Sequence, residues 1–289
     1  MKKNFELITV VLIAHKSKEI VLNFIKNLSK DIKILVIDNS NDLDLENEIN
    51  KKKNVKIKLM NNNGYGSAIN YARTCIDTKY FFVFSPDVKN VDDEFIDIFV
   101  DGLKDIKLFG ALGPRFLDVT EKSHKQSDIK EEVGEIESIS GAAMFFETTI
   151  FDKIGGFDEN FFLYFEETDY CKRAQEKGYK IYQINKTKVV HPKGVNMGGV
   201  VMTKNLNEVK NLEKLYSWHF MWSKFYYYRK HYSLPLTLLY FVPIILRIRF
   251  KIIFHILKGD KKNIEKYKAR WSGLINSIYG KKSYLRVQN

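Results

Sequence analysis

The sequence predicts an α/β fold in which a doubly wound, mostly parallel sheet is followed by a C-terminal helical extension. Short apolar runs alternate with polar turns and amphipathic stretches over the first two thirds of the chain, which is the pattern of repeated strand, turn and helix units. The first of these runs is almost continuously apolar, as expected for a strand covered on both faces. From about residue 204 the pattern changes to long helices. We therefore expect an α/β domain over 1–203 and a helical tail over 204–289.

The individual elements follow from hydrophobic periodicity and from the turn residues between the runs. We expect strands at 7–14, 32–37, 55–60, 80–84, 108–114, 140–146, 180–184 and 188–190. Helices are expected at 17–28, from the turn at 61–67 through residue 75, at 92–104 and at the end of the stretch 155–173. The polar stretch 118–137 is expected to form a surface loop.

Composition and charge place the chain among ordinary globular proteins with one unusual feature. It has 289 residues, of which 45% are hydrophobic and 28% charged, and this length supports a sizeable core. The net charge of +12 is concentrated in residues 229–289, which contain 14 Lys and Arg but only two acidic residues. Two cysteines without framework spacing favour a reducing compartment, and the N-terminal apolar run is too short for a signal peptide.

Polar residues follow three of the expected strands. Asp38, the Asn- and Gly-rich turn at 61–67 and Asp87 all come directly after an apolar run. Ligands of open α/β sheets bind outside the carboxyl ends of the strands, so this convergence predicts a nucleotide pocket. Asp38 also has an equally good alternative role, as a turn carboxylate that accepts hydrogen bonds from nearby backbone N–H groups.

The stretch 155–173 has the richest chemistry in the chain. Two glycines open it, six aromatic or aliphatic side chains follow, and Glu166, Glu167 and Asp169 then form an acidic cluster at a helix start. Carboxyl groups held against apolar surface titrate at raised pH, which suits a general base. The alternative is structural: acidic residues favour any helix N-terminus, and Asp169 and Arg173 form an i,i+4 pair.

Residues 155–173 (Gly-Gly-Phe-Asp-Glu-Asn-Phe-Phe-Leu-Tyr-Phe-Glu-Glu-Thr-Asp-Tyr-Cys-Lys-Arg) resemble the acceptor-side motif of family 2 inverting glycosyltransferases. The match is closest to the bacterial rhamnosyltransferase-like group, and the resemblance covers roughly the first two thirds of the chain. It implies a GT-A-like catalytic domain over 1–203. On the acceptor side it implies that Glu167 is the catalytic base, with Glu166 as the alternative. Asp158 then shapes the acceptor site, and Asp169 and Arg173 are expected to bind substrate there as well. Arg173 alternatively orients the acids or simply pairs with Asp169.

On the donor side, the resemblance implies that Asp38 and the backbone of Ala14 and His15 bind the nucleotide base. Residues 62–70 (Asn-Asn-Gly-Tyr-Gly-Ser-Ala-Ile-Asn) are similar to a donor-binding segment of the family. Glycine-rich turns at helix starts bring N–H groups to anions, and here the expected substrate-binding residues are Asn62, Gly64 and Asn70. The chain has Ile69 where relatives commonly show a second Asn.

A metal site is implied by the same resemblance. Ser85-Pro86-Asp87 resembles the family's metal motif, with Ser85 in place of the usual Asn and without a second aspartate. One carboxylate together with the diphosphate of the donor suits Mn²⁺ or Mg²⁺. His191 would complete the ligand set, as a histidine at this place does in some relatives. Its structural alternative is a hydrogen-bonded histidine at a strand end.

The tail has features of a membrane-associating segment. Trp218, Trp222 and three tyrosines precede Arg229-Lys230, an order typical of a membrane interface. The uncharged run 234–246 is shorter than the roughly 20 residues of a spanning helix. Beyond it, residues 247, 251, 255 and 258 form one narrow polar stripe, and the other positions are mostly apolar with Arg249 as the exception. This pattern fits a helix lying in a bilayer surface. The alternative is a helix packed on the catalytic domain.

These inferences predict a metal-dependent inverting glycosyltransferase. We expect it to move a sugar, with dTDP-rhamnose as the candidate donor, onto a lipid-linked saccharide in bacterial surface polysaccharide synthesis. The expected location is the cytoplasm, attached peripherally to the inner face of the cell membrane through anionic lipid. Two alternatives are a nucleotidyltransferase that makes a nucleotide sugar and a basic nucleic-acid-binding protein. We expect no nucleic-acid partner, because the basic residues alternate with an apolar stripe.

Overall fold

The computed structural model describes residues 4–104, 106, 108–118, 126–192 and 206–286. Its centre is an eight-stranded sheet with the strand order β3-β2-β1-β4-β7-β5-β8-β6. The strands are β1 (Ile8–Ala14), β2 (Lys33–Asp38), β3 (Val55–Leu59), β4 (Tyr80–Phe84), β5 (Phe109–Phe116), β6 (Val133–Glu135), β7 (Ala143–Glu147) and β8 (Lys180–Val189).

The pairing of the strands confirms the predicted mostly parallel sheet. β1 runs parallel to both β2 and β4, β2 runs parallel to β3, and β5 runs parallel to β8. β7 is antiparallel to both of its neighbours, and β6 is antiparallel to β8. Two details differ from expectation. The stretch expected to be a loop contains the short edge strand β6, and the two short strands expected near residue 185 form the single strand β8, whose pairing with β5 is irregular after Pro114.

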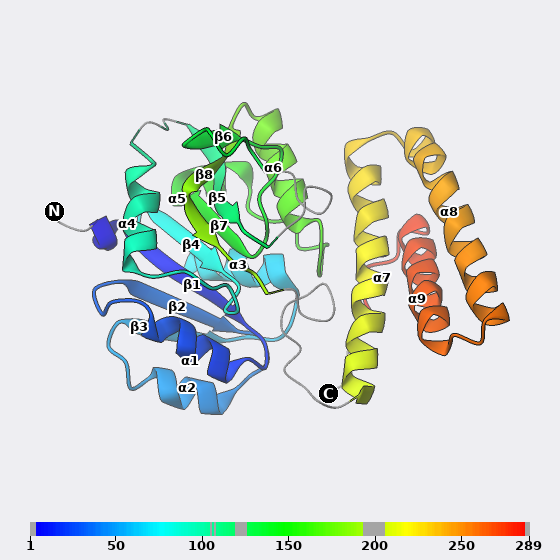
Figure 1. The fold of residues 1–289 in the computed structure, drawn as a ribbon, viewed down its shortest axis with the longest axis horizontal. Helices are drawn as coiled ribbons and strands as arrows, with labels where there is room; N and C mark the ends of the chain where they lie inside the picture. The colour runs from blue at the N-terminus through cyan, green and yellow to red at the C-terminus, as the bar shows by residue number, and fades with distance from the viewer. Residues whose placement is uncertain (1–3, 105, 107, 119–125, 193–205, 287–289) are drawn as a thin grey trace.

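Helices cover both faces of the sheet (Figure 1). The helices of the α/β body are α1 (Lys18–Lys26), α2 (Leu43–Ile49), α3 (Tyr65–Thr74), α4 (Asp93–Asp101), α5 (Thr148–Ile154) and α6 (Glu166–Glu176). Side chains of α1, α2 and α4 pack on one face, and side chains of α3, α5 and α6 pack on the other. Alternate residues of β1, for example Val10 and Val11, enter the two opposite cores, as the period of a strand requires. The sequence analysis did not predict α2 and α5.

The C-terminal part consists of α7 (Leu206–His231), α8 (Leu234–Leu257) and α9 (Lys261–Ile278). In Figure 1, α7 stands between the α/β body and the α8 and α9 pair. α9 packs closely along α7, and a Cβ atom at Gly273 would lie 2.2 Å from the carbonyl oxygen of Trp218. The predicted boundary between residues 203 and 204 lies outside the described residues.

The structure corrects one interpretation of the tail. Trp218 and Trp222 are only 2% and 3% exposed, and the indole of Trp222 donates a hydrogen bond to the carbonyl of Lys281. The aromatic and basic run of α7 is therefore a packing seam between helices, and the interpretation of these two tryptophans as membrane-interface residues is wrong. No helix among the described residues is both long enough and apolar enough to cross a bilayer.

Candidate active site

The acidic cluster lies at the start of α6, directly after two residues in the left-handed backbone region. Tyr164 has a φ of 70° and Phe165 a φ of 71°. Bulky residues avoid this region, and surrounding contacts must hold them there at a cost of about 1–3 kcal/mol each. The resulting sharp turn starts the helix at Glu166 and places Glu166 and Glu167 in its first turn. Strained backbone of this kind is concentrated at functional sites.

The two glutamates are unusual because part of each carboxyl group lacks a partner. Glu166 is 4% exposed, and the Oε2 atoms of both Glu166 and Glu167 are buried without a hydrogen bond. Burial raises the pKa of Glu167 to about 6. Burial, and then the negative charge of Glu167, raise the pKa of Glu166 well above its ordinary value. Glu167 is therefore the carboxyl group that ionises near pH 6 and is available as a base at neutral pH.

The hydroxyl of Tyr65 marks the point where the acids converge with the expected metal residue. It donates a hydrogen bond of 2.6 Å to the carbonyl of Gly141, and a Cβ atom at Gly141 would lie 3.9 Å from Cδ of Glu167. Burial first, and then the negative charges of Glu166, Glu167 and Asp87, raise the pKa of Tyr65 well above its usual range. The charges of all three carboxyl groups therefore act on one tyrosine, which lies between the carboxyl end of β4 and the start of α6.

Asp87 and His191 lie side by side although 104 positions separate them in the sequence. Nε2 of His191 is 3.3 Å from Oδ1 of Asp87, and Ser85 donates a hydrogen bond of 2.5 Å to the same oxygen. An isolated antiparallel bridge between Lys89 and Val190 joins the two loops that carry them. The two residues predicted for the metal site, Asp87 and His191, are therefore brought together, next to Ser85, for which substrate binding stays a prediction.

This arrangement fits a divalent cation with an incomplete protein ligand set. Nε2 of His191 is buried without a hydrogen-bond partner, and it points at a carboxylate, which is a hard ligand for Mn²⁺ or Mg²⁺. Within the described residues no group of three or more His, Cys, Asp or Glu could hold a metal. A cation held by Asp87 and His191 would therefore need further oxygens from a substrate such as a diphosphate.

The turn before α3 packs tightly against residues 155–165, here called the motif loop, which lead to Glu166 and Glu167, here called the acid pair. Gly64 has a φ of 114°, and a Cβ atom there would lie 2.6 Å from the carbonyl oxygen of Phe162. The N–H of Tyr65 donates to that oxygen at 3.1 Å. Any side chain at Gly64 would push these segments apart. Asn62 is half-buried in the same turn, so the donor-binding roles expected of Asn62 and Gly64 stay predictions.

Asn70 is engaged with the motif loop. Its amide donates to the carbonyl of Phe157 and to the carboxylate of Glu159, both at 2.9 Å. Its Oδ1 accepts from the N–H of Phe157 at 2.9 Å. These bonds use most of the hydrogen-bonding capacity of the side chain. Asn70 therefore joins α3 to the motif loop, and its direct contact with a substrate stays a prediction.

Asp38, Ala14 and His15 lie together at the carboxyl ends of β1 and β2. Ala14 pairs with Asp38 across the two strands, and Nδ1 of His15 is 2.9 Å from Oδ1 of Asn39. The carboxylate of Asp38 is fully buried and accepts hydrogen bonds from Ser40 N, Ser40 Oγ and Asp42 N. These are the contacts of the structural alternative, while binding of a nucleotide base by Asp38 stays a prediction.

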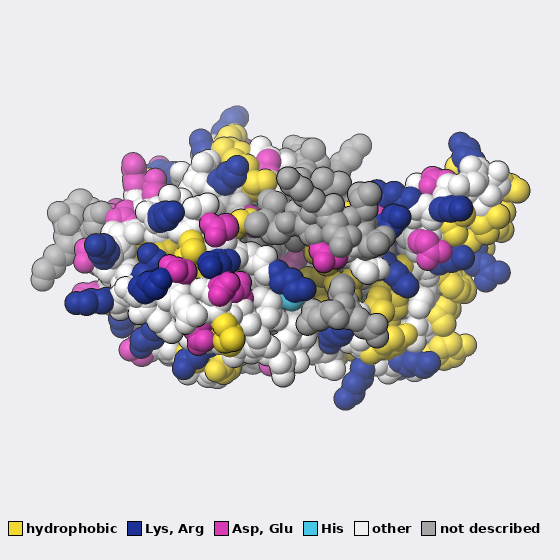
Figure 2. Space-filling model, turned by 90° about the horizontal axis from the view of Figure 1, so that it is seen from below, with side chains coloured by type: hydrophobic (Ala, Val, Ile, Leu, Met, Phe, Trp, Pro, Cys, Tyr) yellow, Lys and Arg dark blue, Asp and Glu magenta, His cyan; other side chains and the backbone are white. Residues whose placement is uncertain are grey.

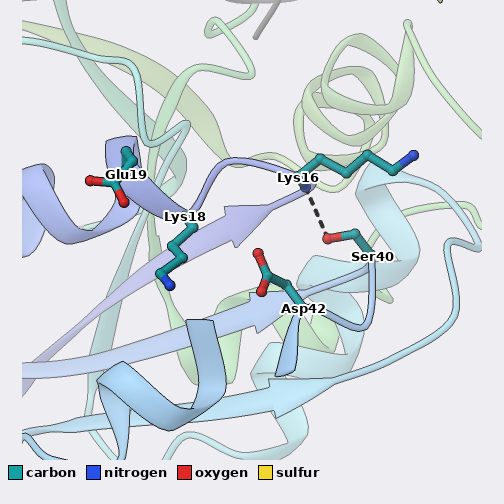
Figure 3. Close-up of a pocket in the computed structure, with 5 residues that line it drawn as sticks. All are labelled: Lys16, Lys18, Glu19, Ser40 and Asp42. Carbon is teal, nitrogen blue, oxygen red and sulfur yellow. Dashed lines mark hydrogen bonds between the residues drawn. The ribbon is translucent and has the colours of Figure 1, made fainter. Parts of the chain in front are cut away.

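A hollow of about 480 Å³ opens beside these residues, between the loops that follow β1 and β2. Its lining consists of Lys16, Lys18, Glu19, Ser40 and Asp42 (Figure 3). The backbone N–H of Lys16 donates to Ser40 Oγ at 2.9 Å and ties the two loops together. In Figure 3 the Lys18 side chain extends toward the Asp42 side of the hollow, and Glu19 points away from it. The volume is in the range of small-ligand sites.

A second group of residues holds the motif loop and α6 in place. Asp169 is fully buried. Its carboxylate oxygens lie 2.8 Å from Arg173 Nε, 2.7 Å from Lys230 Nζ and 2.8 Å from His231 Nε2. Arg173 also donates to the carbonyls of Ile154 and Gly156. A buried charge with three partners is a structural feature. These contacts match the pairing alternative for Asp169 and Arg173, and direct substrate binding by either residue stays a prediction.

Asp158 belongs to the same group. Its Oδ2 accepts hydrogen bonds from the Tyr226 hydroxyl at 3.0 Å and from Lys230 Nζ at 2.7 Å. Burial would raise the pKa of Asp158, but the hydrogen bonds from Lys230 and Asn160 outweigh it and hold this pKa below the ordinary value. The expected role of Asp158 in shaping the acceptor site stays a prediction. The structure adds that two residues of α7, Tyr226 and Lys230, hold this carboxylate.

The contacts from α7 were missed by sequence reasoning, although a signal for them exists. Ser223 Oγ donates to the carbonyl of Leu163 at 2.8 Å, so Ser223, Tyr226 and Lys230 all contact the motif loop. They are spaced i, i+3 and i+7 and therefore lie on one helix face. The aromatic residues of the same segment favoured a membrane-interface interpretation of this helix instead.

Comparisons with known proteins agree with this geometry. No family model matches the chain. The chain is 20% identical over 211 residues to a low-salt glycan biosynthesis hexosyltransferase, Agl10, from Haloferax volcanii, and the match covers 65% of this chain and 68% of that protein. This match establishes glycosyltransferase homology. The narrower rhamnosyltransferase-like assignment stays a prediction.

Solved structures with a similar fold include a transferase by name and two proteins solved with nucleotides or a nucleotide sugar. A mannosyltransferase from Pyrobaculum calidifontis, solved with GDP-Man and Mn²⁺, covers 96% of this chain and 88% of its own, with 12% identity and a TM-score of 0.56. TarS from S. aureus, residues 1–349 with UDP-GlcNAc, covers 96% and 93%, with 13% identity and a TM-score of 0.55. GalNAc-T7 with UDP, GalNAc and Mn²⁺ covers 66% of this chain but only 44% of its own, with 14% identity and a TM-score of 0.54. These likenesses confirm the GT-A-like fold.

Proposed function

We propose that this protein is an inverting glycosyltransferase of the family 2 type, which moves a hexose from a nucleoside diphosphate sugar to an acceptor hydroxyl. One observation carries the proposal. Tyr65 hydrogen-bonds to Gly141, which lies next to Glu167, and the negative charges of the acid pair and of Asp87 all act on the Tyr65 hydroxyl, which supports a base and a cation-binding carboxylate near one another. Glycosyl transfer needs this combination, because a hydroxyl must lose a proton while a diphosphate leaves.

The residues of the chain divide into three tasks. Glu167, with a pKa raised to about 6, is ionised at neutral pH and accepts the proton of the acceptor hydroxyl as that oxygen attacks the anomeric carbon. The pKa of Glu166 is raised further by the charge of Glu167, so Glu166 is the weaker candidate for the base. Asp87 and His191 would hold a cation, and Mn²⁺ or Mg²⁺ bound there would supply positive charge for the diphosphate leaving group.

The donor would lie along the carboxyl ends of β1, β2 and β4. The hollow beside Lys16 and Lys18 has room for a nucleoside, and a diphosphate reaching from there toward Asp87 and His191 crosses the edge of the sheet where ligands of such folds bind. Three neighbours of known structure carry UDP, GDP-Man or UDP-GlcNAc by name. The motif in residues 155–173 makes dTDP-rhamnose the first donor to test.

We further propose that the acceptor is a lipid-linked saccharide and that the protein attaches peripherally to the inner face of the cell membrane. α8 exposes a continuous apolar stripe along one face, formed by Leu236, Leu239, Leu246, Phe250, Ile253 and Leu257. Its opposite face packs on the other two helices through Phe241 and Ile248. Figure 2 shows hydrophobic side chains gathered at this end of the molecule with Lys and Arg around them. Such a face suits an anionic bilayer surface.

A transfer assay tests the enzymatic proposal. The protein would be incubated with Mn²⁺ and, in turn, dTDP-rhamnose, UDP-GlcNAc and GDP-mannose, with a membrane extract as the source of acceptor. Release of a nucleoside diphosphate together with label in an extracted glycan, inverted at the anomeric carbon by NMR, is expected for one donor. Release of inorganic diphosphate from a nucleoside triphosphate and a sugar phosphate would instead show a nucleotidyltransferase.

A further inference from the structure

Arg270 is a cationic side chain near the motif loop that has no anionic partner among the residues that the structure describes. The guanidinium of Arg270 on α9 packs over the rings of Phe220 and Tyr267, with its carbon 6.0 Å and 5.4 Å from their centroids. Phe220 in turn contacts Tyr164 and Phe165, at ring distances of 5.7 Å and 5.9 Å. Arg270 is therefore one aromatic layer away from the strained turn that carries the acid pair.

Arg270 is held there at an energetic cost. Its Nε atom is buried without a hydrogen-bond partner, and it forms no ion pair with any residue that the structure describes. Burial lowers the pKa of its guanidinium, which shows that the charged form is poorly solvated. Buried charges are normally paired, because leaving one unpaired costs several kcal/mol. An unpaired guanidinium beside a candidate active site indicates a missing anion.

A second cation lies on the same face of α9. Lys266 precedes Arg270 by one helical turn and is partly buried, and burial, followed by the charge of Arg270, lowers the pKa of its ammonium. The nearby carboxylate of Glu213 is engaged at 2.9 Å by Lys262. Lys266 and Arg270 are neighbours at i and i+4, and an anion bound by both would remove the repulsion between them.

We propose that Lys266 and Arg270 bind the phosphate or diphosphate group of a lipid-linked acceptor. This inference rests on the proposed function and adds the chemical class of the acceptor. A planar guanidinium offers two parallel N–H donors that match a phosphate. The surroundings of the two cations also suit such a ligand. Phe220 joins Arg270 to the motif loop, so a sugar attached to the phosphate would lie near the acid pair. α8 packs on the same helix, since Arg249 of α8 lies over Trp271, the next residue of α9, and the lipid chain would extend past α8 toward its exposed apolar stripe.

The test is a binding measurement with farnesyl diphosphate as the probe, using the full chain in a buffer with EDTA so that no metal-dependent donor site competes. We expect calorimetry to detect binding to the unaltered protein, at least tenfold weaker binding to Arg270→Met, and nearly unchanged binding to Lys268→Met, an exposed lysine of the same helix. Arg270→Lys, which keeps the charge but loses the planar fork, should be intermediate. A melting curve for each variant distinguishes lost binding from lost folding.

Two further ligands identify the source of the anion. Farnesol should not bind, and inorganic diphosphate should bind more weakly than farnesyl diphosphate. Equal binding of inorganic diphosphate, or equal affinity of Arg270→Met and the unaltered protein for the probe, would overturn the proposal. Binding of nucleotide sugars with Mn²⁺ is measured in parallel. A protein that binds a nucleotide sugar but not farnesyl diphosphate would sink this inference and leave the proposed function standing.

Discussion

The ammonium of Lys230 on α7 lies 2.7 Å from the fully buried carboxylate of Asp169 on α6. The same ammonium lies 2.7 Å from Asp158 in the motif loop. One side chain of the tail therefore joins the helix of the acid pair to the loop that precedes it. The tail is thus part of the frame that positions the candidate base.

Lys230 should act as a positioning residue. Lys230→Met would leave Asp169 with Arg173 and His231, and Asp158 without its ion pair. We therefore expect a loss of about 1–3 kcal/mol in the free energy of unfolding and a fall in kcat with little change in donor affinity. Lys230→Arg should restore part of the activity. Lys210→Met, an exposed lysine of α7, is the matched control. A Lys230→Met protein with full kcat would exclude the positioning role.

The two glutamates should separate clearly in a transfer assay. Glu167→Gln removes the base, and we expect kcat to fall by about 10²–10⁴, with donor binding intact by calorimetry. Glu166→Gln places a neutral, isosteric side chain at the position with the more strongly raised pKa. The fall in kcat should therefore be much smaller than for Glu167→Gln. If Glu166→Gln abolishes transfer and Glu167→Gln keeps it, the base is Glu166.

The pH dependence follows from the raised pKa of Glu167. The base works only when ionised, so kcat/KM should rise with pH through about 6, the pKa of Glu167, and level off above it. The direction is fixed because protonation of a carboxylate at low pH removes the base. The profile should be measured with Mn²⁺ saturating at each pH. A profile that is flat from pH 5 to 8 contradicts the assignment.

Asp87 should control metal-dependent donor binding. Asp87→Asn keeps the size of the side chain but removes the charge next to His191, so affinity for a nucleotide sugar with Mn²⁺ should fall by at least tenfold in calorimetry. His191→Ala should weaken binding less. Asp77→Asn, whose side chain is 83% exposed, is the control for removing one carboxylate. Donor affinity that does not change in Asp87→Asn would remove this residue from the metal site.

Membrane attachment should depend on the exposed stripe of α8. We expect Leu246→Glu with Phe250→Glu to reduce flotation with vesicles that contain phosphatidylglycerol by about tenfold or more, since burying each side chain contributes about 1.5–3 kcal/mol. Leu43→Glu, at an exposed leucine of the α/β body, should float like the unaltered protein. Loss of flotation should occur without a change in the melting temperature. Point changes are preferable to deletion of 233–289, which would also remove the packing of α9 on α7.

Sequence reasoning worked best where a local pattern determines the structure. The apolar runs of β1, β2 and β4 predicted the sheet because strands buried on both faces need such runs. The polar strand ends predicted that Asp38 and Asp87 would lie at one edge. His191 was placed next to Asp87 by the resemblance alone, since no local pattern reports a pairing across 104 positions.

The contacts that sequence reasoning missed depend on packing between distant segments. Trp218 and Trp222 are residue types that are common at membrane interfaces. Here they are buried against α9, a tertiary contact that the residue types alone do not predict. The three partners of Asp169 come from two helices, and only the i,i+4 pair with Arg173 is visible in the sequence. Tyr65 lies in the Asn- and Gly-rich segment 62–70, but its closeness to the two glutamates depends on how α3 and α6 pack, which the local sequence does not show.

The fit of Gly273 against the Trp218 backbone has a practical meaning for protein engineering. α9 cannot move away from α7 without opening that contact, and α7 carries the lysine and tyrosine that brace the acid-bearing segment. Exchanging the C-terminal helices between related enzymes to alter membrane preference would therefore disturb turnover as well. Chimeras should be cut within the body of the enzyme, so that α7, α9 and the motif loop are always inherited from one parent.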